Sequence, residues 1–412
     1  MNQLISVNYL RRSLPLLLAF FIAGCGGGGG MDPILGGGSF GQAAGTTAGQ
    51  GVSAGPPTID SGAPNVTSES PLNGASGMCL TTAVTATFNK PMDASTINTT
   101  TFQVMANGAL VPGLVSYNAT TRVAKFAPID AAGFAASSAF VVTVKSGNAG
   151  VRDAGSQPMA ADVVWNFTTG TKACVAPVNL RSAGLFGGFG GGAGVTNQGI
   201  NTVVNGNLGT TAACTLITGF HDASNVYTET PLNIGAVKNG AVYCAPPSPG
   251  TTASMAIATQ AAADAKQAYN EMAALPAGSD PGAGQLGGLV LPAAVYTSAG
   301  GTFAITTGDL TLDAQGNPDA VWVFQVPSAL TIGLSATTRK VLLLNGAQAK
   351  NVFWQVGSAA RIEDGSSMVG TIIASAGVTI STAGQTAQTN LTGRALGLAA
   401  SVTMVNTTVV AP

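Results

Sequence analysis

The chain has 412 residues, enough for two or three domains, and 46% of them are hydrophobic, which excludes disorder along the whole chain. Charged residues make up only 8%, against about 25% in an average soluble protein, so Thr, Ser, Asn, Ala and Gly must cover most of the surface. The formal net charge is −1 and no basic patch is visible, which excludes nucleic acid as a partner because phosphate binding needs clustered Lys and Arg.

Residues 1–24 have the pattern of an export signal. Arg11 and Arg12 supply positive charge, and the apolar run that follows is too short to span a bilayer. The tetrapeptide IAGC at 22–25 resembles the lipobox of bacterial lipoproteins, which implies cleavage before Cys25 and lipid attachment to it. Gly26 follows instead of Asp, and this favours the outer membrane or cell surface. The alternative is an ordinary secretory signal with a Cys there by chance.

Residues 25–63 are dominated by Gly, Ala, Ser and Thr, with few apolar side chains. A segment of this composition cannot bury enough surface to fold, so it predicts a flexible tether. The tether would hold the folded part of the chain away from the membrane.

Residues 64–171 predict a β-sandwich of about seven short strands. Apolar or alternating runs at short spacing carry this prediction: 83–88, 102–105, 114–117, 123–126, 140–144 and 163–167. The phrase ATFNKPMDASTINTTTFQV and the ending WNFTTG resemble the bacterial Ig-like domain of S-layer and other surface proteins. That resemblance implies a spacer or stalk. Asp93 and Asp153 could suggest calcium, but we interpret them as turn-capping carboxylates.

A hinge is expected at 172–177, and a second domain at 178–412. Within it the segment 252–275 predicts one long helix, since Ala is the best helix former. An apolar face is predicted from side chains that recur at steps of three or four, and Pro276 with Gly278 would end the helix. The side chains of this predicted face are Met255, Ala262, Ala265, Tyr269 and Met272.

The stretch from Gly308 to Ala374 contains three runs rich in Val, Ile, Leu, Phe and Trp, separated by turns of Gly, Asn, Asp and Pro. Each run is too short for a helix and is typical of a buried strand. A spacing of about 20 residues between runs suits one coil of a parallel β-solenoid. Trp322 and Trp354 lie inside apolar runs and are therefore predicted to be core residues.

Several long phrases of the second domain resemble the ice-binding protein family of bacteria and fungi. These phrases are NLRSAGLFGGFGGGAGVTNQG, GGLVLPAAVYTSAG, TLDAQGNPDAVWVFQV, NVFWQVGSAARIEDGSSMVGTIIAS and LTGRALGLAASVTMVNTTV. The resemblance spans about 230 residues. It implies a mainly β fold, a right-handed parallel β-solenoid with one long α-helix packed alongside it, following the Ig-like β-sandwich.

Apart from Cys25, four cysteines remain, an even number that fits disulfides in an exported protein. Three pairings are possible. We favour Cys79–Cys174 and Cys214–Cys244, because each pair would then stay within one proposed domain. No CxxC spacing is present, so a thiolate metal site is not expected, and no cofactor is predicted.

The inventory of reactive side chains argues against an enzyme. His221 is the only histidine, no G-x-S-x-G motif is present, and no His cluster could bind zinc. Carboxylates are few and mostly lie in predicted turns, including Asp313 and Asp319, whose loop departs from EF-hand spacing. Glu363 and Asp364 are adjacent, so in a strand they would face opposite sides and form no acid–base pair.

A binding surface is the better interpretation, and the resemblance implies adsorption to ice. Small Thr, Ser and Ala side chains on one solenoid face would form a flat plane, and Thr is stiff at χ1. The motif Thr-Ala-Gln-Thr at 386–389 is the one repeat of the family type in this domain. Thr371 is a weaker candidate, since Ile373 on the same side of a strand is expected to be core. The candidate ice-binding residues are Thr302, Thr306, Thr331, Ser375, Thr379, Ser381, Thr386 and Thr389.

The sequence thus predicts an exported, lipid-anchored protein whose solenoid binds ice, limits recrystallisation or attaches cells to ice. The alternative is a surface adhesin or structural module whose flat face binds polysaccharide or another non-ice surface. Exposed aromatic side chains would favour carbohydrate, whereas regular rows of threonine would favour ice.

Overall fold

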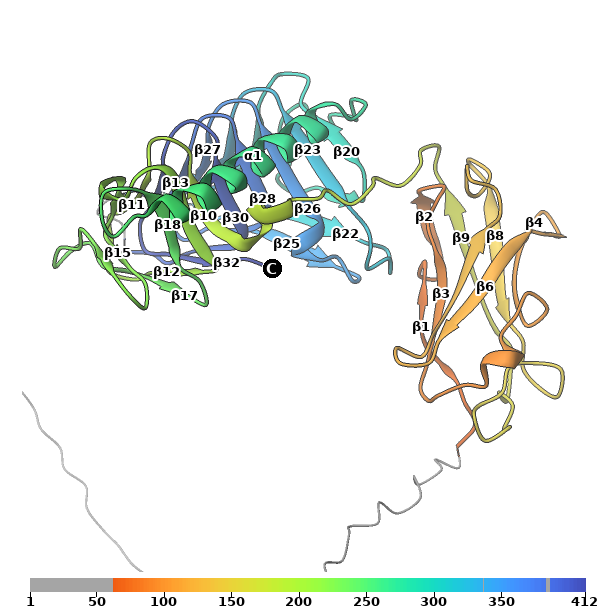
Figure 1. The fold of residues 1–412 in the computed structure, drawn as a ribbon. Coiled ribbons are helices and arrows are strands. Elements are labelled where there is room, and N and C mark those ends of the chain that lie inside the picture. The colour runs from red at the N-terminus through yellow and green to blue at the C-terminus, as the bar shows by residue number, and fades with distance from the viewer. Residues whose placement is uncertain (1–61, 336, 383–385) are drawn as a thin grey trace, which may run out of the picture. The chain divides into compact units, whose positions relative to one another are not determined.

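The computed structural model describes residues 62–335, 337–382 and 386–412, which form an Ig-like β-sandwich and a β-solenoid (Figure 1). Among these residues α1 (Thr252–Ala273) is the single α-helix, and strands dominate the rest. No helix in this part of the chain has the length and apolar character needed to cross a membrane. The predicted signal, Cys25 and almost all of the predicted tether lie outside the described residues.

The sandwich has a four-stranded sheet in the order β1-β3-β7-β6 and a five-stranded sheet in the order β2-β9-β8-β4-β5. All pairings are antiparallel except that of β2 with β9. The strands are β1 Val66–Ser70, β2 Ala75–Met78, β3 Val84–Phe88, β4 Phe102–Ala106, β5 Ala109–Leu110, β6 Gly113–Asn118, β7 Val123–Pro128, β8 Ala139–Val144 and β9 Val163–Thr169, with a 3-10 turn η1 at Ala94–Thr96.

Alternation of buried and exposed side chains builds the core of the sandwich. In β9, Trp165 and Phe167 point inward, whereas Val164 is exposed. Together with Phe102 and Phe140 they belong to one apolar cluster between the two sheets. The six predicted runs are confirmed as β3, β4, β6, β7, β8 and β9. The strands β1, β2 and β5 escaped prediction because their sequences, VTSES, ASGM and AL, lack apolar alternation.

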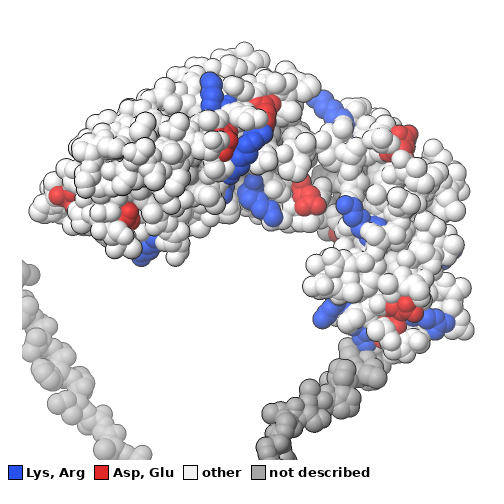
Figure 2. Space-filling model, viewed as in Figure 1, with Lys and Arg blue, Asp and Glu red and all other residues white. Residues whose placement is uncertain are grey.

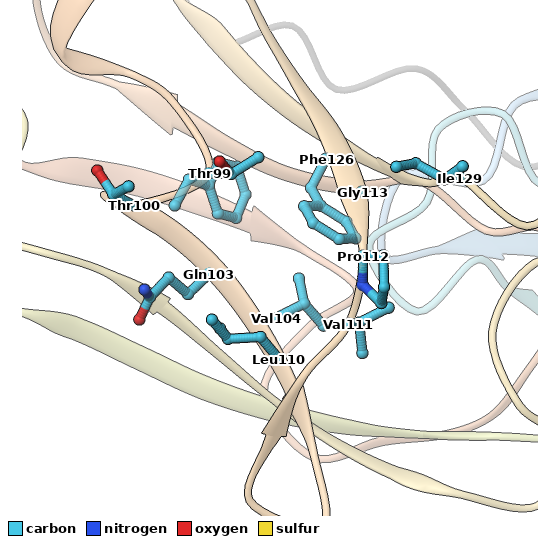
Figure 3. A pocket seen from close by; sticks show the side chains of 11 residues that line it. Thr99, Thr100, Gln103, Val104, Leu110, Val111, Pro112, Gly113, Phe126 and Ile129 are labelled. Carbon is cyan, nitrogen blue, oxygen red and sulfur yellow. The ribbon is translucent and has the colours of Figure 1, made fainter.

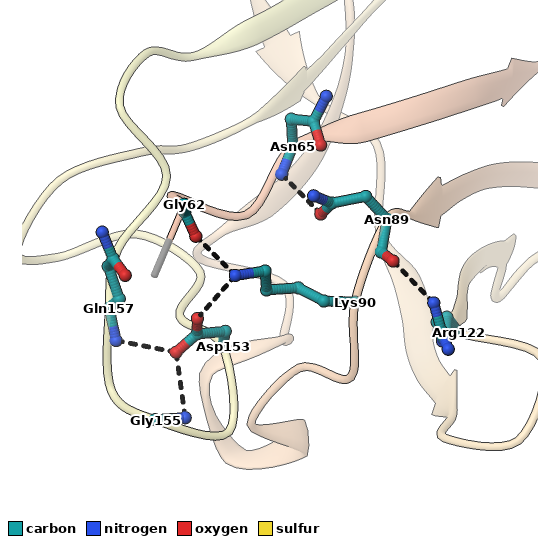
Figure 4. Close-up of polar contacts among 8 residues, drawn as sticks. All are labelled: Gly62, Asn65, Asn89, Lys90, Arg122, Asp153, Gly155 and Gln157. Atoms are coloured by element: carbon teal, nitrogen blue, oxygen red, sulfur yellow. Dashed lines mark hydrogen bonds and ion pairs between the residues drawn. The ribbon is translucent and has the colours of Figure 1, made fainter. Parts of the chain in front are cut away.

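Polar contacts hold the point where the chain enters the sandwich (Figure 4). Lys90 Nζ lies 3.6 Å from Asp153 Oδ2 and donates a hydrogen bond to the carbonyl of Gly62. Asp153 Oδ1 accepts from two backbone N–H groups of the following turn, both at 2.9 Å. Asp93 accepts from Ser95 N at 2.9 Å, and its hydrogen bonds with Ser95 lower the pKa of this carboxyl. Both carboxylates cap turns, as predicted.

Each solenoid coil has straight segments on up to three faces, so parallel strands of successive coils stack into sheets (Figure 1). The helix-covered face stacks β20, β23, β26, the second halves of β28 and β30, β10, β13 and β18. The threonine face stacks β21, β24, β27, β29, β31, β11 and β14. The third face combines β19, β22 and β25 with the first halves of β28 and β30, β32, β12 and β17.

The strands of the three faces have the following bounds. On the helix-covered face they are β20 Val295–Thr297, β23 Trp322–Val326, β26 Val352–Val356, β28 Ser367–Ala374, β30 Thr389–Gly397, β10 Phe186–Gly190, β13 Asn207–Ala213 and β18 Val242–Ala245. On the threonine face they are β21 Phe303–Ile305, β24 Leu330–Ile332, β27 Ala360–Ile362, β29 Val378–Ile380, β31 Val402–Met404, β11 Val195–Asn197 and β14 Ile217–Thr218. On the third face they are β19 Val290–Pro292, β22 Leu310–Asp313, β25 Val341–Leu344, β32 Thr407–Val410, β12 Thr202–Asn205 and β17 Gly235–Lys238, beside the hairpin β15 Phe220–His221 and β16 Val226–Tyr227. Short 3-10 turns are η2 Arg181–Leu185, η3 Cys214–Leu216 and η4 Ala349–Asn351.

The order of the stack differs from the order of the chain. The first coils stack against the last one, so that β31 lies between β29 and β11. In the sequence, α1 comes after the first coils and before the later ones. It runs along the outside of the solenoid (Figure 1), and its 22 residues span about 33 Å. Eight strands spaced about 4.8 Å apart span nearly the same length. The helix therefore takes the chain from one end of the stack to the other, and the remaining coils wind back.

Alanine lets α1 lie close to the sheet beneath it. Thr251 caps its N-terminus by accepting from Ser254 N at 3.0 Å. The buried stripe of the helix is Ala258, Ala261, Asp264, Ala265, Ala268 and Met272. The helix was predicted at 252–275 and is confirmed, but the prediction that Met255 belongs to its buried face is wrong, since Met255 is 42% exposed. Small side chains at the contact allow a shorter distance between helix and sheet. The alanine-rich side of α1 therefore faces the sheet, and Met255 does not.

Aromatic side chains stack inside the coils. Tyr296, Phe324 and Trp354 occupy equivalent positions in β20, β23 and β26, and the ring centroids of the last two are 3.9 Å apart. Trp322 and Trp354 are fully buried, as predicted, and donate to backbone carbonyls at 3.1 and 2.9 Å. The predicted spacing of about 20 residues holds from β10 to β13, from β26 to β28 and from β28 to β30. It is longer from β20 to β23 and from β23 to β26, where loops intervene before β23 and before β25, and from β13 to β18.

Both favoured disulfides are present. Cys79 pairs with Cys174 and Cys214 pairs with Cys244, with Cα–Cα distances of 4.8 and 5.1 Å. The second bond joins η3 to β18, the strand that precedes α1.

Candidate functional site

The threonine face carries a single row of outward side chains. Each of its strands contributes one half-buried residue between two buried neighbours. Paired residues in the parallel ladders place these side chains directly above one another. In stacking order the row is Thr218, Thr196, Thr403, Thr379, Arg361, Thr331 and Ala304.

Local sequence explains the row. The strands read apolar, Thr, apolar, as in Val378-Thr379-Ile380 and Leu330-Thr331-Ile332, so the flanking side chains fill the core and Thr must point outward. Because successive strands pair without a register shift, each outward residue of the row lies above the next. Thr218 Oγ1 and Thr196 Oγ1 are 3.3 Å apart, which shows how closely neighbouring hydroxyls approach.

A second row of small residues borders the threonines on the side where each strand begins. Its members are Thr302, Ala329, Ala359, Gly377, Ser401 and Gly194. The carbonyl of each of the last five accepts a backbone hydrogen bond from the neighbouring coil at 3.1 to 3.2 Å. None of these side chains is larger than Thr, so none of them extends further from the backbone than the threonines beside it.

Two rows of small residues give this face distinct chemistry. Strands lie about 4.7–4.9 Å apart, so the threonine hydroxyls and methyls repeat at that distance along the solenoid. The branched Cβ of Thr restricts its χ1 angle, so little side-chain entropy is lost when a surface binds. The face can therefore order water or an extended surface over many weak contacts.

Arg361 is the one charged residue in the row. Its Nε and Nη2 atoms donate to the two carboxylate oxygens of Glu363, with Nη2–Oε2 at 3.2 Å. Nη2 also donates to Thr382 Oγ1 at 2.8 Å. The hydrogen bonds with Glu363 raise the pKa of Arg361. The side chain of Arg361 is 43% exposed, whereas that of Glu363 is 11% exposed.

The structure places the predicted candidate residues in several environments. Thr331 and Thr379 lie in the threonine row, and Thr302 lies in the row of small residues. Thr306 accepts from Gln285 Nε2 at 2.7 Å just beyond β21, and Thr386 is exposed in the loop before β30. These residues remain candidates by position alone.

Three other candidates lie away from the exposed row. Ser381 is 1% exposed and Thr389 is 0% exposed, so the prediction that they belong to a binding surface is wrong. The chain turns a corner after β29, and Thr389 Oγ1 accepts from Gly365 N at 2.9 Å inside the fold. Ser375 donates its hydroxyl to the carbonyl of Gly357 at another corner. Thr371 is fully buried, as expected from its position beside Ile373.

Sequence reasoning missed Thr196, Thr218 and Thr403. The family-type motif Thr-Ala-Gln-Thr at 386–389 lies elsewhere, in a loop and at the start of a buried strand. The useful signal was the recurring triplet of an apolar residue, Thr and another residue that faces the core. It occurs as VTN, VTM and VTI on this face.

Other polar clusters in the described residues have structural partners. His221 Nδ1 lies 2.5 Å from Glu229 Oε1, and Asp222 accepts from the backbone N–H groups of Ser224 and Asn225 at 2.8 Å. Within the described part of the chain no group of three or more His, Cys, Asp or Glu side chains could hold a metal ion.

The Ig-like domain has a depression in its surface (Figure 3). It has a volume of about 350 Å³ and is lined mainly by apolar side chains, including Leu110, Val111, Phe126 and Ile129. No residue that lines it carries an ionisable side chain. Its side chains therefore supply no acid–base chemistry.

The described surface carries few charges. Figure 2 shows a small number of Lys, Arg, Asp and Glu side chains, some of them in small groups of both signs, with broad uncharged areas between them. This agrees with the 8% of charged residues in the whole chain. A weakly charged surface with a flat row of threonines has little to offer an ionic ligand.

The fold and this face define a class: a parallel β-solenoid with one face of regularly stacked, mostly threonine side chains. The family model described as "Ice-binding-like" matches residues 189–410, and the model described as "Bacterial Ig-like domain" matches residues 60–169. The chain belongs to the ice-binding-like family and carries a bacterial Ig-like domain before its solenoid.

Two relatives named as ice-binding proteins agree with this assignment. An ice-binding protein of Nostoc sp. is 33% identical over 235 residues, which cover 57% of this chain and 74% of the relative. An ice-binding protein of Leucosporidium sp. is 32% identical over 204 residues, covering 48% of this chain and 70% of the relative. A solved glycosylated ice-binding protein from an Arctic yeast is 28% identical, with a TM-score of 0.48, and the match covers 58% of this chain and 95% of that one.

Proposed function

We propose that the threonine face adsorbs to ice. The observation that carries the proposal is the register of four consecutive threonines, Thr218, Thr196, Thr403 and Thr379, on a face that no helix covers. Membership of the ice-binding-like family supports it. Recrystallisation inhibition and attachment to ice would both follow from adsorption, because a bound protein blocks growth of the crystal surface beneath it.

The physical basis is the fit between an ordered surface and ordered water. Threonine methyls restrict neighbouring water, while the hydroxyls offer a donor and acceptors at fixed positions. A single hydroxyl–water contact is weak, but a rigid row makes many contacts at once with little loss of conformational freedom. No step of bond breaking is required, so we propose no enzymatic activity.

We further propose that the protein is exported and held at the outer membrane or cell surface through a lipid on Cys25. The support comes from the lipobox at 22–25 and the Gly-rich segment that follows it. A lipid-modified Cys with several acyl chains would anchor stably. The tether and the Ig-like domain would then act as spacers that present the solenoid to ice.

Binding of polysaccharide is the weaker alternative. Protein surfaces that bind carbohydrate commonly use exposed aromatic rings. All three tryptophans of this chain, Trp165, Trp322 and Trp354, are instead at most 2% exposed. The threonine row contains no aromatic side chain either.

The test uses the chain from Gly26 to Pro412, which lacks the predicted signal and the lipid-bearing Cys. We expect thermal hysteresis and inhibition of ice recrystallisation from the unmodified protein. Thr379→Tyr places a bulky ring in the middle of the row and should abolish most of both activities. Thr392→Tyr, an exposed threonine on the third face, is the matched control and should leave them intact.

Two results would contradict the proposal. One is a folded protein without thermal hysteresis or recrystallisation inhibition at high micromolar concentration. The other is equal loss of activity in Thr379→Tyr and Thr392→Tyr, since that would separate ice binding from the threonine face. Localisation is tested separately, by labelling with a fatty-acid analogue in a bacterial host and comparing the natural chain with Cys25→Ser.

A further inference from the structure

We propose that Arg361 sets the limit of the ice-contact area and confines adsorption to the section formed by Thr218, Thr196, Thr403 and Thr379. This inference rests on the proposed function of the threonine face. The residue occupies the fifth position of a row in which five of the seven members are threonines.

The register makes Arg361 an interruption of the row and not an edge of it. Thr379 pairs with Arg361 on one side, and Thr331 pairs with Arg361 on the other. The inward neighbours Ala360 and Ile362 are buried like those of every other strand on this face. The backbone therefore continues without a break, and only the side chain changes.

The guanidinium is held in place and does not swing freely. Two of its nitrogens bind both oxygens of Glu363, and Nη2 also binds Thr382 Oγ1 at 2.8 Å. Such bidentate pairs are geometrically specific. Since Glu363 is largely buried at the corner of the coil, the charge stays beside the row instead of moving into bulk water.

A fixed charge at this position opposes ice contact for two reasons. Arg extends further from the backbone than Thr, so a flat crystal face cannot approach both residues equally. The contacts with Glu363 and Thr382 use only Nε and Nη2, so the exposed remainder of the guanidinium keeps hydrating water, and removing that water costs free energy. Contact is favourable only where the surface is both flat and uncharged.

The size of the effect follows from the spacing of strands. The four threonines before Arg361 span three intervals, or about 14 Å. A threonine at position 361 would join them to Thr331 and lengthen the row to about 24 Å. The contact area would grow by more than half, and adsorption should strengthen accordingly.

The deciding experiment compares the unmodified chain with the double variant Arg361→Thr/Glu363→Gln. The second substitution avoids leaving a largely buried carboxylate without its partner. We expect thermal hysteresis at equal molar concentration to rise at least twofold. Lys350→Thr, which removes one positive charge in η4 away from the row, is the control and should not change it. Circular dichroism and the melting temperature establish that each variant is folded.

A second comparison uses tyrosine on the two sides of Arg361. In the unmodified chain Thr331→Tyr should cost less activity than Thr196→Tyr, because Thr331 lies beyond the charge. In the Arg361→Thr/Glu363→Gln background the two substitutions should cost the same. These paired measurements remain informative even if the double variant melts at a lower temperature.

The outcomes separate the inference from the proposed function. An inactive but folded unmodified chain would overturn the ice-binding proposal itself. An active unmodified chain would overturn the role of Arg361 if the double variant showed no gain, or if Thr331→Tyr and Thr196→Tyr were equally harmful before Arg361 was replaced. The role of Arg361 would be established by two results together. Thermal hysteresis would rise in the double variant, and Thr331→Tyr and Thr196→Tyr would differ in their effects before Arg361 is replaced and have equal effects afterwards.

Discussion

The helix-covered face and the threonine face belong to the same coils but differ in the outward side chains that they expose to solvent. The second half of β28 sends Ile373 outward, where it is fully buried beneath α1 with Phe353 and Leu396. Six residues later β29 sends Thr379 outward to a half-buried, uncovered position. The backbone and the stacking distance are the same on both faces. Large apolar side chains require a cover, whereas small hydroxyl-bearing side chains make an uncovered face stable in water.

The contrast teaches how a solenoid can separate stability from binding. Burial of about 25 cal/mol per Å² of apolar surface makes the helix-covered face a source of stability. The threonine face contributes its inward Val, Ile and Leu to the core, and its outward threonines add little. Its outward residues can therefore vary with function at small cost to folding.

The largest expected effect tests the covered face. Ile373→Ala removes a fully buried side chain under α1 and should lower the free energy of unfolding by about 2–5 kcal/mol. Urea unfolding followed by tryptophan fluorescence measures this loss, because Trp322 and Trp354 lie inside the solenoid. Ice activity of the folded fraction should persist. Loss of activity without loss of stability would break the separation between the faces.

The disulfide near the start of α1 should have the next largest effect. Cys214 and Cys244 are 30 residues apart, and opening such a loop typically costs about 2–4 kcal/mol. The variant Cys214→Ser/Cys244→Ser should therefore melt at a lower temperature in differential scanning calorimetry. The matched change at Cys79 and Cys174 should destabilise the Ig-like domain and leave the ice activity of the solenoid unchanged.

A polar clamp on α1 gives a smaller and pH-dependent effect. Asp264 accepts hydrogen bonds from Ser182 N at 3.0 Å, from the Ser182 hydroxyl and from Gln260 Nε2 at 3.0 Å. The hydrogen bond from the Ser182 hydroxyl is the main cause of the lowered pKa of this carboxyl. Replacing Asp264 by Ala should cost about 1–3 kcal/mol at neutral pH.

The sign of the pH dependence follows from the lowered pKa. The stabilisation from Asp264 is fully present above the unfolded pKa of about 3.9 and is lost as the pH falls through the lower folded value. Urea unfolding of the natural chain and of Asp264→Ala between pH 7 and pH 2.5 should therefore converge at the acid end. A difference that is constant with pH would show that the ionised carboxylate contributes nothing.

The smallest effect on stability is expected on the threonine face. Thr379→Ala removes one hydroxyl and one methyl from an uncovered position and should change the free energy of unfolding by no more than about 0.5 kcal/mol. Its ice activity should still fall measurably, though less than in Thr379→Tyr, because alanine keeps the face flat. A large loss of stability in Thr379→Ala would mean that this face also serves the fold.

The sequence by itself determined the kinds of structure present. Short apolar runs bounded by Gly, Asn and Pro were enough to predict the solenoid strands, and an alanine-rich segment was enough to predict α1, because period and propensity are local properties. The core positions of Trp322 and Trp354 were also predicted, because they lie inside apolar runs. Both disulfides were predicted because, of the three possible pairings, this one keeps each pair within one proposed domain. The short edge strands β1 and β5 were missed, as they lack an apolar pattern.

Only the tertiary structure decided which threonines share a face. Thr196 and Thr403 are 207 positions apart in the sequence, yet they are paired neighbours because the first coils stack on the last one. Ser381 and Thr389 were predicted to lie on the binding face, but both are buried where the chain turns corners. The register between parallel strands and the positions of the corners depend on long-range packing, and no local pattern contains that information. Whether Arg361 interrupts the row could be seen only once that register was known.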